Sequence, residues 1–293
     1  VGGTVRDALL YGSPRPDGDL DLVVSGMGYD ELESVLQRSG KTSTVGKSFA
    51  VVKFTIDSVT YDVAVPRKER LKDPAGSGHR NFHVESGRHI SLEEDLGRRD
   101  FTCNSIASRL SDGKLFDPYN GLRAIADRRI VMTSPQSFFD DPLRILRAAR
   151  FASVLGFSLQ ADIYPQARKT SLTELSMERV AEELIRLLLE SARPSLGLTE
   201  YHRLGVLDSL FPELGRLTLT IQDAIFHPET DEFGHHTVWG HLLIAVDIAA
   251  RLSRELDLGD AQRLSLLLAT LLHDLGKAET TVWDFKKGRM TVT

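Results

Sequence analysis

The stretch Asp19-Leu20-Asp21-Leu22-Val23-Val24 decides the fold of the first part of the chain. Its apolar residues suit a buried strand, and two carboxylates two residues apart on a strand point to the same face. Such acids repel each other unless the strand end is exposed or a divalent cation joins them, and hard Mg²⁺ prefers oxygen ligands of this kind. An isolated pair is more typical of a solvated hairpin end, so the neighbouring sequence has to distinguish the two interpretations.

The residues after this stretch predict a small mixed α/β unit. Apolar runs from Ala50 to Ile56 and from Thr60 to Val65 predict two more strands, and the segment from Tyr29 to Arg38 predicts a helix. The segment from Lys72 to Val84 is rich in Gly, Pro and charge, so we expect an exposed, mobile loop rather than a strand.

Other polar residues fit a site on this unit. Asp62 lies between apolar neighbours in a predicted strand and could supply a third carboxylate to the same face. Gly2 and Gly3 precede a predicted helix start, where exposed backbone N–H groups attract phosphate. Arg6 and Asp7 follow, and the simplest alternative for them is a surface ion pair worth ~0–1 kcal/mol.

From Asp141 onward the apolar residues recur at helical spacing, so the remainder of the chain reads as all helix. The stretch from Gly215 to Phe233 contains the expected boundary before a third unit. The sequence therefore predicts an α+β protein, with a mixed-sheet head followed by helical parts. The expected division is 1–125, 126–215 and 216–293.

Composition limits the class of protein. The chain has 293 residues, 41% of them hydrophobic, with a formal charge of −5 and a single cysteine, Cys103. It contains neither a signal peptide nor the ~18-residue apolar run that crosses a membrane, so we expect a reducing, cytoplasmic setting. Because Val1 is not a methionine and leads directly into a turn, we expect a trimmed chain that begins inside its first strand.

Several motifs together resemble the class II nucleotidyltransferases, which comprise CCA-adding enzymes and bacterial poly(A) polymerases. The motifs, in the order of that family, are Val1-Gly2-Gly3-Thr4-Val5-Arg6-Asp7, Asp19-Leu20-Asp21, Gly46-Lys47-Ser48-Phe49, Arg98-Arg99-Asp100-Phe101-Thr102-Cys103-Asn104-Ser105-Ile106-Ala107, Asp117-Pro118-Tyr119-Asn120-Gly121 and Asp140-Asp141-Pro142-Leu143-Arg144-Ile145-Leu146-Arg147. Consecutive motifs in order are far more specific than any one of them. The resemblance implies a polymerase-beta-like head.

The resemblance implies two-metal catalysis. Asp19 and Asp21 would hold two Mg²⁺ ions, with Asp62 as the third catalytic carboxylate. Two ions ~3.5–4 Å apart can clamp the attacking and leaving oxygens of an in-line displacement. The expected reaction activates the RNA 3′-hydroxyl and releases pyrophosphate.

The resemblance also implies a nucleotide site. Its residues in the head would be Gly2, Gly3, Arg6, Arg99, Asp100 and Asn104. Asp100 could accept a hydrogen bond from a ribose 2′-hydroxyl, which would favour ribonucleotides. The residues alone also fit a helix start, with Asp100 as the cap and Asn104 outside the packed structure.

Asp141 and Arg144 are three apart in a predicted helix, so they would share one face and offer an acceptor and a planar donor fork. By resemblance, these side chains select CTP or ATP by reading the base edge. Arg147 would contact phosphate, while Arg147 and Arg150 could instead form a solvated basic face. Glu178-Arg179, with Glu182 and Glu183, resembles a further motif, which an intrahelical charge network explains equally well.

The last part of the chain resembles an HD phosphohydrolase domain. Trp239-Gly240-His241 opens a helical pattern, and His273-Asp274-Leu275-Gly276-Lys277 ends another. His241, His273 and Asp274 are candidate ligands for a divalent transition metal. His235 and His236 compete with His241 for the first-ligand role. The usual fourth ligand is an aspartate well downstream, so we expect the site to be incomplete at Thr293.

These patterns favour an enzyme that adds CMP and AMP to the 3′ end of tRNA, with a possible HD phosphohydrolase activity. Poly(A) polymerases and CC-only or A-only enzymes share the chemistry, although Gly46-Lys47-Ser48-Phe49 lacks the paired basic residues of the poly(A) polymerases. The other alternative is an HD phosphodiesterase with an RNA-binding head. The sequence indicates neither a membrane partner nor an oligomeric state.

Overall fold

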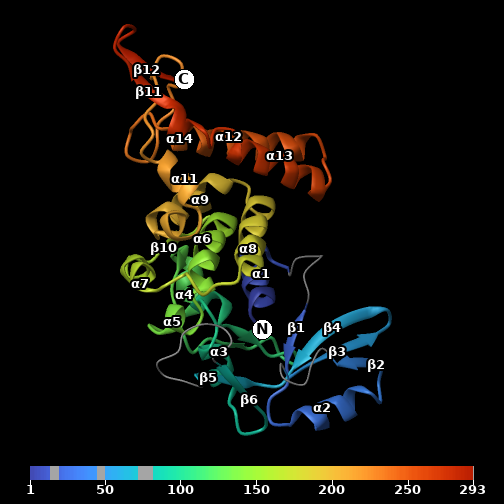
Figure 1. The fold of residues 1–293 in the computed structure, drawn as a ribbon. Coiled ribbons are helices and arrows are strands. Elements are labelled where there is room, and N and C mark those ends of the chain that lie inside the picture. The colour runs from blue at the N-terminus through green and yellow to red at the C-terminus, as the bar shows by residue number, and fades with distance from the viewer. Residues whose placement is uncertain (14–19, 45–49, 72–81, 293) are drawn as a thin grey trace. The chain divides into compact units, whose positions relative to one another are not determined.

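The computed structural model describes most of the chain. The described residues are 1–13, 20–44, 50–71 and 82–292. Within them the chain divides into two compact units, Val1–Asp141 and Pro142–Thr293. Figure 1 shows strands concentrated in the first unit and helices in the second. The Gly46–Phe49 motif and Asp19 lie outside the described residues.

A four-stranded mixed sheet forms one part of the first unit, in the order β1-β4-β3-β2 (Figure 1). Its strands are β1 (Asp21–Val23), β2 (Lys41–Thr44), β3 (Val51–Ile56) and β4 (Val59–Ala64). The β1 strand runs parallel to β4, while β3 pairs antiparallel with both β4 and β2. The predicted strands at β1, β3 and β4 are confirmed, whereas β2 was not predicted because its sequence, Lys-Thr-Ser-Thr, has no apolar run.

Alternation along the strands gives this sheet two different faces. Val52 and Val63 pack with Leu32 of helix α2 (Tyr29–Leu36) into a buried cluster. The opposite face carries Asp21 and Asp62, one residue along from the apolar positions. The predicted helix is therefore confirmed, and it covers the apolar face of the sheet.

The rest of the first unit surrounds a short 3₁₀ helix. Its elements are α1 (Gly3–Tyr11), β5 (Arg67–Leu71), β6 (Phe82–Ser86), α3 (Leu92–Gly97), η3 (Thr102–Asn104), β7 (Ala107–Ser108), β8 (Leu115–Phe116), α4 (Gly121–Ala126), β9 (Arg129–Ile130) and α5 (Ser137–Asp140). A Cβ added to Gly121 would collide with the Thr102 carbonyl oxygen, so α4 packs closely on η3 only because that residue is glycine. The loop predicted from Lys72 to Val84 is wrong at its end, because β6 pairs with β5. The composition of the segment gave no sign that its last residues pair with β5.

The second unit is largely helical. Its helices are α6 (Leu143–Leu155), α7 (Ile163–Lys169), α8 (Met177–Glu190), α9 (Pro194–Arg203), α10 (Val206–Leu210), α11 (Pro212–Leu217), α12 (Val238–Glu255), α13 (Asp260–Leu272) and α14 (Lys277–Thr280). It also contains β10 (Ser158–Leu159) and a hairpin of β11 (Thr281–Asp284) and β12 (Arg289–Val292). The hairpin corrects the expectation of an all-helical remainder. The sequence did not predict this hairpin because its strands are short and because β11 directly follows α14.

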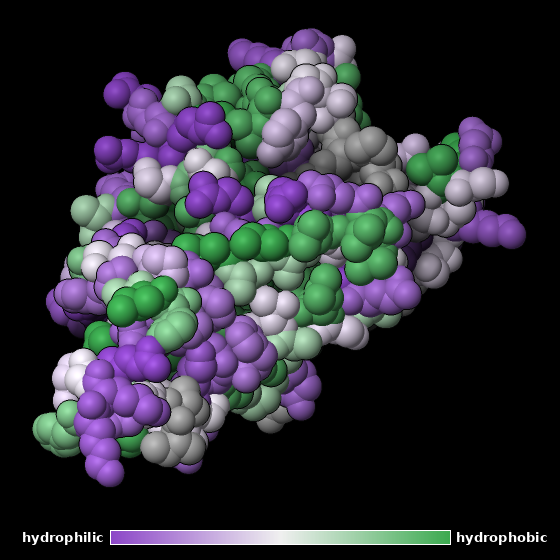
Figure 2. Space-filling model, turned by 90° about the horizontal axis from the view of Figure 1, so that it is seen from above, coloured by the Kyte–Doolittle hydropathy of each residue, from purple (hydrophilic) through white to green (hydrophobic). Residues whose placement is uncertain are grey.

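The helix α12 has both a buried and an exposed apolar face. Trp239, Leu242 and Val246 are buried, whereas Ile248 and Leu252 are exposed, at 45% and 41%. Figure 2 shows hydrophobic side chains gathered in a band on the face seen from above. None of the described helices is both long and apolar enough to cross a membrane.

Candidate functional site

Two carboxylates meet on the polar face of the four-stranded sheet. Asp21 of β1 and Asp62 of β4 are register partners in the parallel pair, so their side chains project from the same face as neighbours. Lys53 stands opposite Asp62 on β3, and its Nζ lies 3.2 Å from the Asp62 Oδ1. Asp21 is exposed and Asp62 is half-buried, so both carboxylates can reach a ligand in solvent. The structure thus brings together two of the three predicted catalytic acids.

The first turn of α1 lies beside β1. The amino group of Val1 donates to the backbone oxygen of Asp21 at 2.8 Å, and the Asp21 N–H donates to Thr4 Oγ1 at 3.5 Å. Gly2 has a φ of +69°, and a Cβ at that position would collide with the Arg99 guanidinium. The left-handed backbone at this position favours glycine, and the missing side chain leaves room for the Arg99 guanidinium.

A buried polar network joins α1 to η3. Arg6 donates through Nε to Asp7 Oδ1 at 2.7 Å and through Nη1 to Asn104 Oδ1 at 2.5 Å, and Asn104 donates to Asp100 Oδ1 at 2.9 Å. All four side chains belong to residues with only 5–6% exposure. Arg6 and Asp7 do form an ion pair, at 2.6 Å, but the alternative that placed this pair at the surface is wrong, because η3 packs against α1 and removes both groups from solvent.

The structure excludes the alternative interpretation of Asp100 as a helix cap with Asn104 outside. The short helix begins at Thr102 with Phe101 as its N-cap, and Asp100 Oδ1 accepts from the Phe101 N–H at 2.8 Å. Asn104 is buried rather than outside, since it links Asp100 to Arg6. The network fixes the orientation of three predicted nucleotide-binding residues.

Arg99 lies next to a buried carboxylate. Its Nη2 is 3.4 Å from Oδ2 of Asp95, which is 1% exposed and also contacts Arg98 at 2.9 Å. Burial alone would raise the pKa of Asp95, but the positive charges of Arg98 and Arg99 and the hydrogen bonds to the carboxylate lower that pKa below its ordinary value. Asp95 therefore stays ionised and orients both guanidinium groups.

The residues predicted to select the base are not on one helix. Asp141 follows α5 with an extended backbone, φ −143° and ψ 101°, and Pro142 is the N-cap of α6. Arg144 lies in the first turn of α6. The expectation of a shared helical face is wrong, because proline at the helix start disfavours helical geometry in the residue before it.

Arg147 and Arg150 lie on α6 but have different environments. The Arg147 side chain is 29% exposed and its Nη1 lies 3.5 Å from Glu183 Oε1. Arg150 is 1% exposed and donates through Nε to Glu183 Oε2 at 2.7 Å and through Nη1 to Glu190 at 3.3 Å. The solvated-face alternative is wrong for Arg150, and Glu183 joins two helices rather than making an intrahelical network.

A second cluster lies in the helical unit, at the ends of α12 and α13. His241 belongs to the first turn of α12, while His273 and Asp274 directly follow α13. One donor atom from each lies within 4.8 Å of the others, as a shared metal ion requires. Lys277 Nζ lies 2.8 Å from Asp274 Oδ2. The three predicted HD residues are thus brought together.

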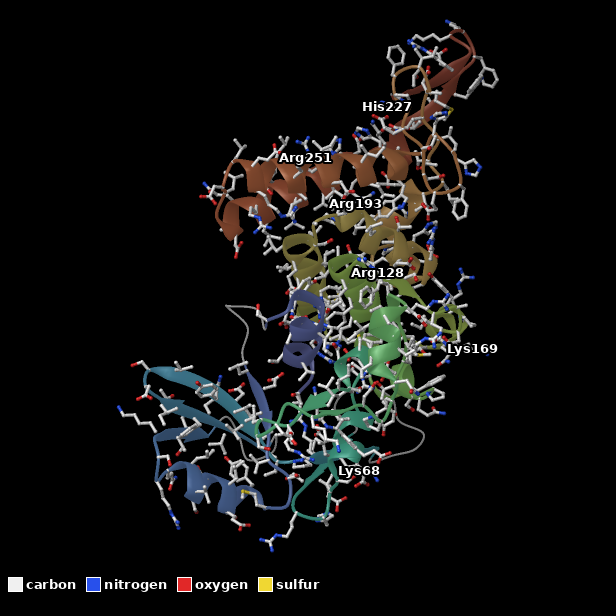
Figure 3. The ribbon with its side chains drawn as sticks, turned by 180° about the vertical axis from the view of Figure 1, so that it is seen from behind. Lys68, Arg128, Lys169, Arg193, His227 and Arg251 are labelled. Carbon is white, nitrogen blue, oxygen red and sulfur yellow. The ribbon has the colours of Figure 1, made fainter. Side chains whose placement is uncertain are left out.

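Sequence reasoning missed two further members of this cluster. His227 and Glu229 place donor atoms within 4.8 Å of each other and of His241, and Figure 3 labels His227 in the segment that precedes α12. Burial, together with the nearby positive charge of Lys277, lowers the pKa of His227. The signal available in the sequence was the His227-Pro228-Glu229 triplet.

The competing histidines have other partners. His236 Nδ1 lies 3.1 Å from the Glu229 carbonyl oxygen, and His235 Nδ1 lies 3.8 Å from Asp231 Oδ2. Across the described ranges, neither His235 nor His236 joins a group of donor atoms close enough to hold one ion.

Comparison with known protein families gives two matches. Residues 1–131 match the poly A polymerase head domain, and residues 164–217 match a probable RNA- and SrmB-binding site of polymerase A. A multifunctional CCA protein from Xanthomonas campestris pv. campestris (strain B100) is 39% identical over 287 residues, which cover 96% of this chain. The chain spans 63% of the length of that relative.

Solved structures give the same result. A CCA-adding enzyme in its apo form II is similar with a TM-score of 0.65 and 25% identity, over 93% of this chain and 59% of that one. The Bacillus stearothermophilus CCA-adding enzyme in complex with CTP has a TM-score of 0.55 and 25% identity, over 96% of this chain and 72% of that one. The similarity confirms the predicted α+β class, with a mixed-sheet head and a largely helical body.

Proposed function

Because this chain belongs to the class II family of CCA-adding enzymes and poly(A) polymerases, we propose that it transfers CMP and AMP from CTP and ATP to the 3′ end of tRNA. The observation that carries the proposal is the register pairing of Asp21 with Asp62 on the polar face of the sheet. A neighbouring pair of acids with apolar residues on the opposite face has little structural use. The pair of carboxylates suits a cation site, and the bound cations would in turn attract phosphate.

The residues present fit a Mg²⁺ site. Asp21 and Asp62, joined by Asp19 as predicted, would hold the ions through hard carboxylate oxygens. When bound, such ions stabilise the attacking and leaving oxygens of phosphoryl transfer. Lys53, 3.2 Å from Asp62, partly neutralises the acids and keeps the site charge-balanced. Removing the charge of Lys53 would therefore change the affinity of the carboxylates for the cation.

The incoming nucleotide would lie between the first turn of α1 and η3. Gly3 offers its backbone amide at the positive end of α1, where a triphosphate is favoured. The Gly2 N–H donates to the Ile106 carbonyl oxygen at 3.0 Å, so Gly2 would serve by its left-handed backbone rather than by its amide. Arg6, bound to Asn104, holds the Asp100 carboxylate in place beside the turn. Asp100 would then accept from the ribose 2′-hydroxyl, and Arg99 would contact phosphate.

Selection of cytosine and adenine would depend on Asp141 and Arg144. Asp141 supplies an acceptor from an extended backbone and Arg144 a planar donor fork from the first turn of α6. Arg147 would bind a phosphate of the nucleotide. Such contacts carry ~1–3 kcal/mol of discrimination per base.

Nucleotide incorporation is the direct test. Purified protein, Mg²⁺ and tRNA lacking its terminal CCA are incubated with CTP, with ATP, or with both. The expected products are CC with CTP alone and CCA with both. A long oligo(A) product, or extension that stops at CC or adds only A, would identify the alternative enzymes of the same family. No incorporation with any nucleotide would contradict the proposal.

The cluster of His241, His273 and Asp274 favours a second function. We propose that 216–293 is part of an HD domain whose imidazole and carboxylate donors bind a divalent transition metal and support phosphohydrolase chemistry. The division into 1–125, 126–215 and 216–293, with a polymerase-beta-like head, belongs to the same proposal. Hydrolysis of 2′,3′-cyclic nucleotides that His273→Ala removes would support it, and hydrolysis that persists in that variant would contradict it.

The predicted cytoplasmic location also belongs to this proposal. Cys103 is buried, and burial raises the pKa of its thiol to about 12, so the thiol stays protonated and unreactive. Fractionation of cells producing the protein would test the location, and recovery in a membrane fraction would contradict it.

A further inference from the structure

We propose that His227 and Glu229 are metal ligands and that, with His241, His273 and Asp274, they form a five-residue site for one divalent transition-metal ion. The inference extends the metal centre proposed above and rests on it. The three-residue set leaves a metal ion incompletely coordinated, whereas the five-residue set can fill its coordination sphere with residues of the second unit alone.

The imidazole spacing fits a single ion. The ring centroids of His227 and His241 lie 5.2 Å apart, and those of His241 and His273 lie 5.6 Å apart. Metal–nitrogen bonds of about 2.0–2.1 Å place neighbouring imidazole centroids roughly 5 Å apart. Both pairs are steeply inclined, with interplanar angles of 70°. The rings are therefore not stacked, and one donor nitrogen from each ring of a pair lies within 4.8 Å of the other.

His241 belongs to both groups of donor atoms. A neutral imidazole normally binds metal through one nitrogen. One ion that takes donors from both groups is therefore simpler than two ions bridged by the same ring. Three nitrogen and two oxygen donors suit Mn²⁺, Co²⁺, Ni²⁺ or Zn²⁺ better than Mg²⁺, which prefers oxygen.

The Glu229 carboxylate has an unsatisfied oxygen. Its Oε2 is buried and accepts no hydrogen bond from any residue that the structure describes. Its Oε1 lies 3.8 Å from His241 Nδ1, too far for a hydrogen bond. A buried carboxylate oxygen without a donor is costly, and a cation among the imidazoles would remove that cost.

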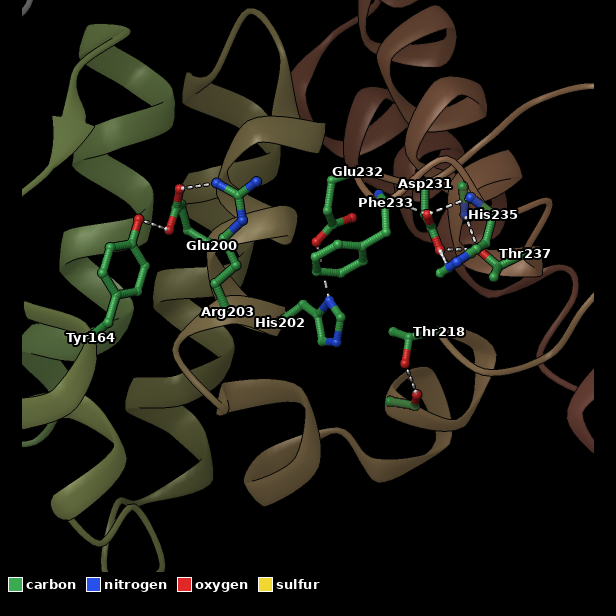
Figure 4. Close-up of polar contacts among 12 residues, drawn as sticks. Tyr164, Glu200, His202, Arg203, Thr218, Asp231, Glu232, Phe233, His235 and Thr237 are labelled. Atoms are coloured by element: carbon green, nitrogen blue, oxygen red, sulfur yellow. Dashed lines mark hydrogen bonds and ion pairs between the residues drawn. The ribbon is translucent and has the colours of Figure 1, made fainter. Parts of the chain in front are cut away.

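The backbone around Glu229 is fixed against α12. A Cβ on Gly240 would lie 2.5 Å from the Asp231 amide nitrogen, so the segment packs directly on the turn that carries His241. Asp231 accepts from the His235 N–H at 3.0 Å and from Thr237 Oγ1 at 3.2 Å, as Figure 4 shows. Because Thr237 is the N-cap of α12, the hydrogen bonds of Asp231 connect the segment that carries Glu229 to the start of this helix. The ligands are therefore preorganised.

Cobalt binding tests the assignment. Titration of the 293-residue protein with Co²⁺ in excess Mg²⁺, which keeps the carboxylates of the sheet occupied, is followed by visible absorption and calorimetry. One Co²⁺ ion per chain is expected. His227→Asn and Glu229→Gln should each weaken binding at least about ten-fold. His273→Ala serves as the positive control, and His235→Asn as the matched control because that imidazole is exposed and close by. Thermal melts without metal identify any variant that fails to fold.

The outcomes separate this inference from the proposals on which it rests. Parent-like Co²⁺ affinity in both His227→Asn and Glu229→Gln, with loss in His273→Ala, would overturn the five-residue site and leave the three-residue centre standing. Two ions per chain would overturn the single-ion arrangement. No binding to the parent would overturn both metal proposals. Nucleotide incorporation should be unchanged in every variant, so these results do not depend on the transferase function.

Discussion

The acids of the sheet and the ligands of the helical unit reach their sites in different ways. Asp21 and Asp62 lie on adjacent strands, and the alternation that buries Val63 also turns the acids to the opposite face. His227, Glu229 and His273 come from a loop before α12 and from the end of α13. The first arrangement follows from local periodicity, whereas the second requires the packing of segments that share no pattern.

The comparison also separates two kinds of buried charge. In the first unit, Arg6, Asn104 and Asp100 form a hydrogen-bonded chain beside the proposed nucleotide site. In the second unit, Arg150 and Glu183 bind each other inside a helical bundle. A buried arginine helps to fix the carboxylate that we propose for the ribose in one case, and joins two helices in the other. Substitutions should therefore have different primary effects in the two units.

The largest effect is expected at the sheet. Asp62→Asn or Asp21→Asn should reduce CTP incorporation by at least about 10⁴-fold, a barrier increase of more than ~5 kcal/mol, because the amide cannot replace a charged metal ligand. Asp57→Asn is the matched control, since Asp57 has a φ of +50°, which asparagine tolerates. Loss of more than ten-fold in the control, or near-parent activity in Asp62→Asn, would contradict the assignment.

The buried pair of the helical unit should affect stability most. Glu183→Gln should lower the free energy of unfolding by up to ~3–5 kcal/mol, because it leaves the buried Arg150 with only Glu190, 3.3 Å away, as a counter-charge. The double variant Arg150→Met/Glu183→Leu should recover much of that loss, since it removes both charges. Urea unfolding measures both. A double variant as unstable as Glu183→Gln would show that hydrogen-bond geometry, rather than charge, dominates.

A smaller effect is expected for base selection. Arg144→Ala should lower kcat/KM for CTP and ATP by about 10–100-fold, equivalent to ~1–3 kcal/mol, with a melting temperature close to that of the parent. Steady-state kinetics with each nucleotide measures the change. Arg179→Ala provides a control on α8, in a charged stretch that we leave out of the nucleotide site. Equal losses in the two variants would remove Arg144 from the proposed site.

The smallest effect is expected for a surface-proximal pair. His202 Nδ1 lies 3.2 Å from Glu232 Oε1 (Figure 4), and that hydrogen bond raises the pKa of His202. Burial by itself would raise the pKa of Glu232, but the hydrogen bond from His202, a backbone hydrogen bond and the charges of His202 and Arg203 together lower it. The pair therefore stabilises the folded state most between the ordinary pKa values, 4.5 for Glu and 6.5 for His.

The pH dependence of His202→Gln tests this pair. The contribution of His202 is lost as pH rises through its raised folded pKa, and that of Glu232 is lost as pH falls through its lowered folded pKa. The free energy of unfolding of the parent should exceed that of His202→Gln by no more than ~1 kcal/mol near pH 5.5, and by less near pH 8.5. Thermal melts at both pH values measure the difference. A larger stability difference at pH 8.5 than at pH 5.5 would contradict the raised pKa of His202.

The sequence by itself determined the strands at β1, β3 and β4, the helix α2 and the α+β class, because each depends on periodicity within a few residues. It also indicated Asp21, Asp62, His241 and His273 as chemically active residues. It could not distinguish Arg147 from Arg150, which follow the same helical stripe three residues apart, and it left open whether Asn104 and the Arg6–Asp7 pair lie at the surface.

Only the tertiary structure decided which polar groups are buried and which residues face each other. Arg150 and Glu183 are 33 positions apart in the sequence, and Arg6 and Asn104 are 98 apart. Whether a guanidinium lies in solvent or against a carboxylate depends on which helix covers it. Local spacing fixes the direction of a side chain from its own element, but contact with a distant partner depends on how the elements pack.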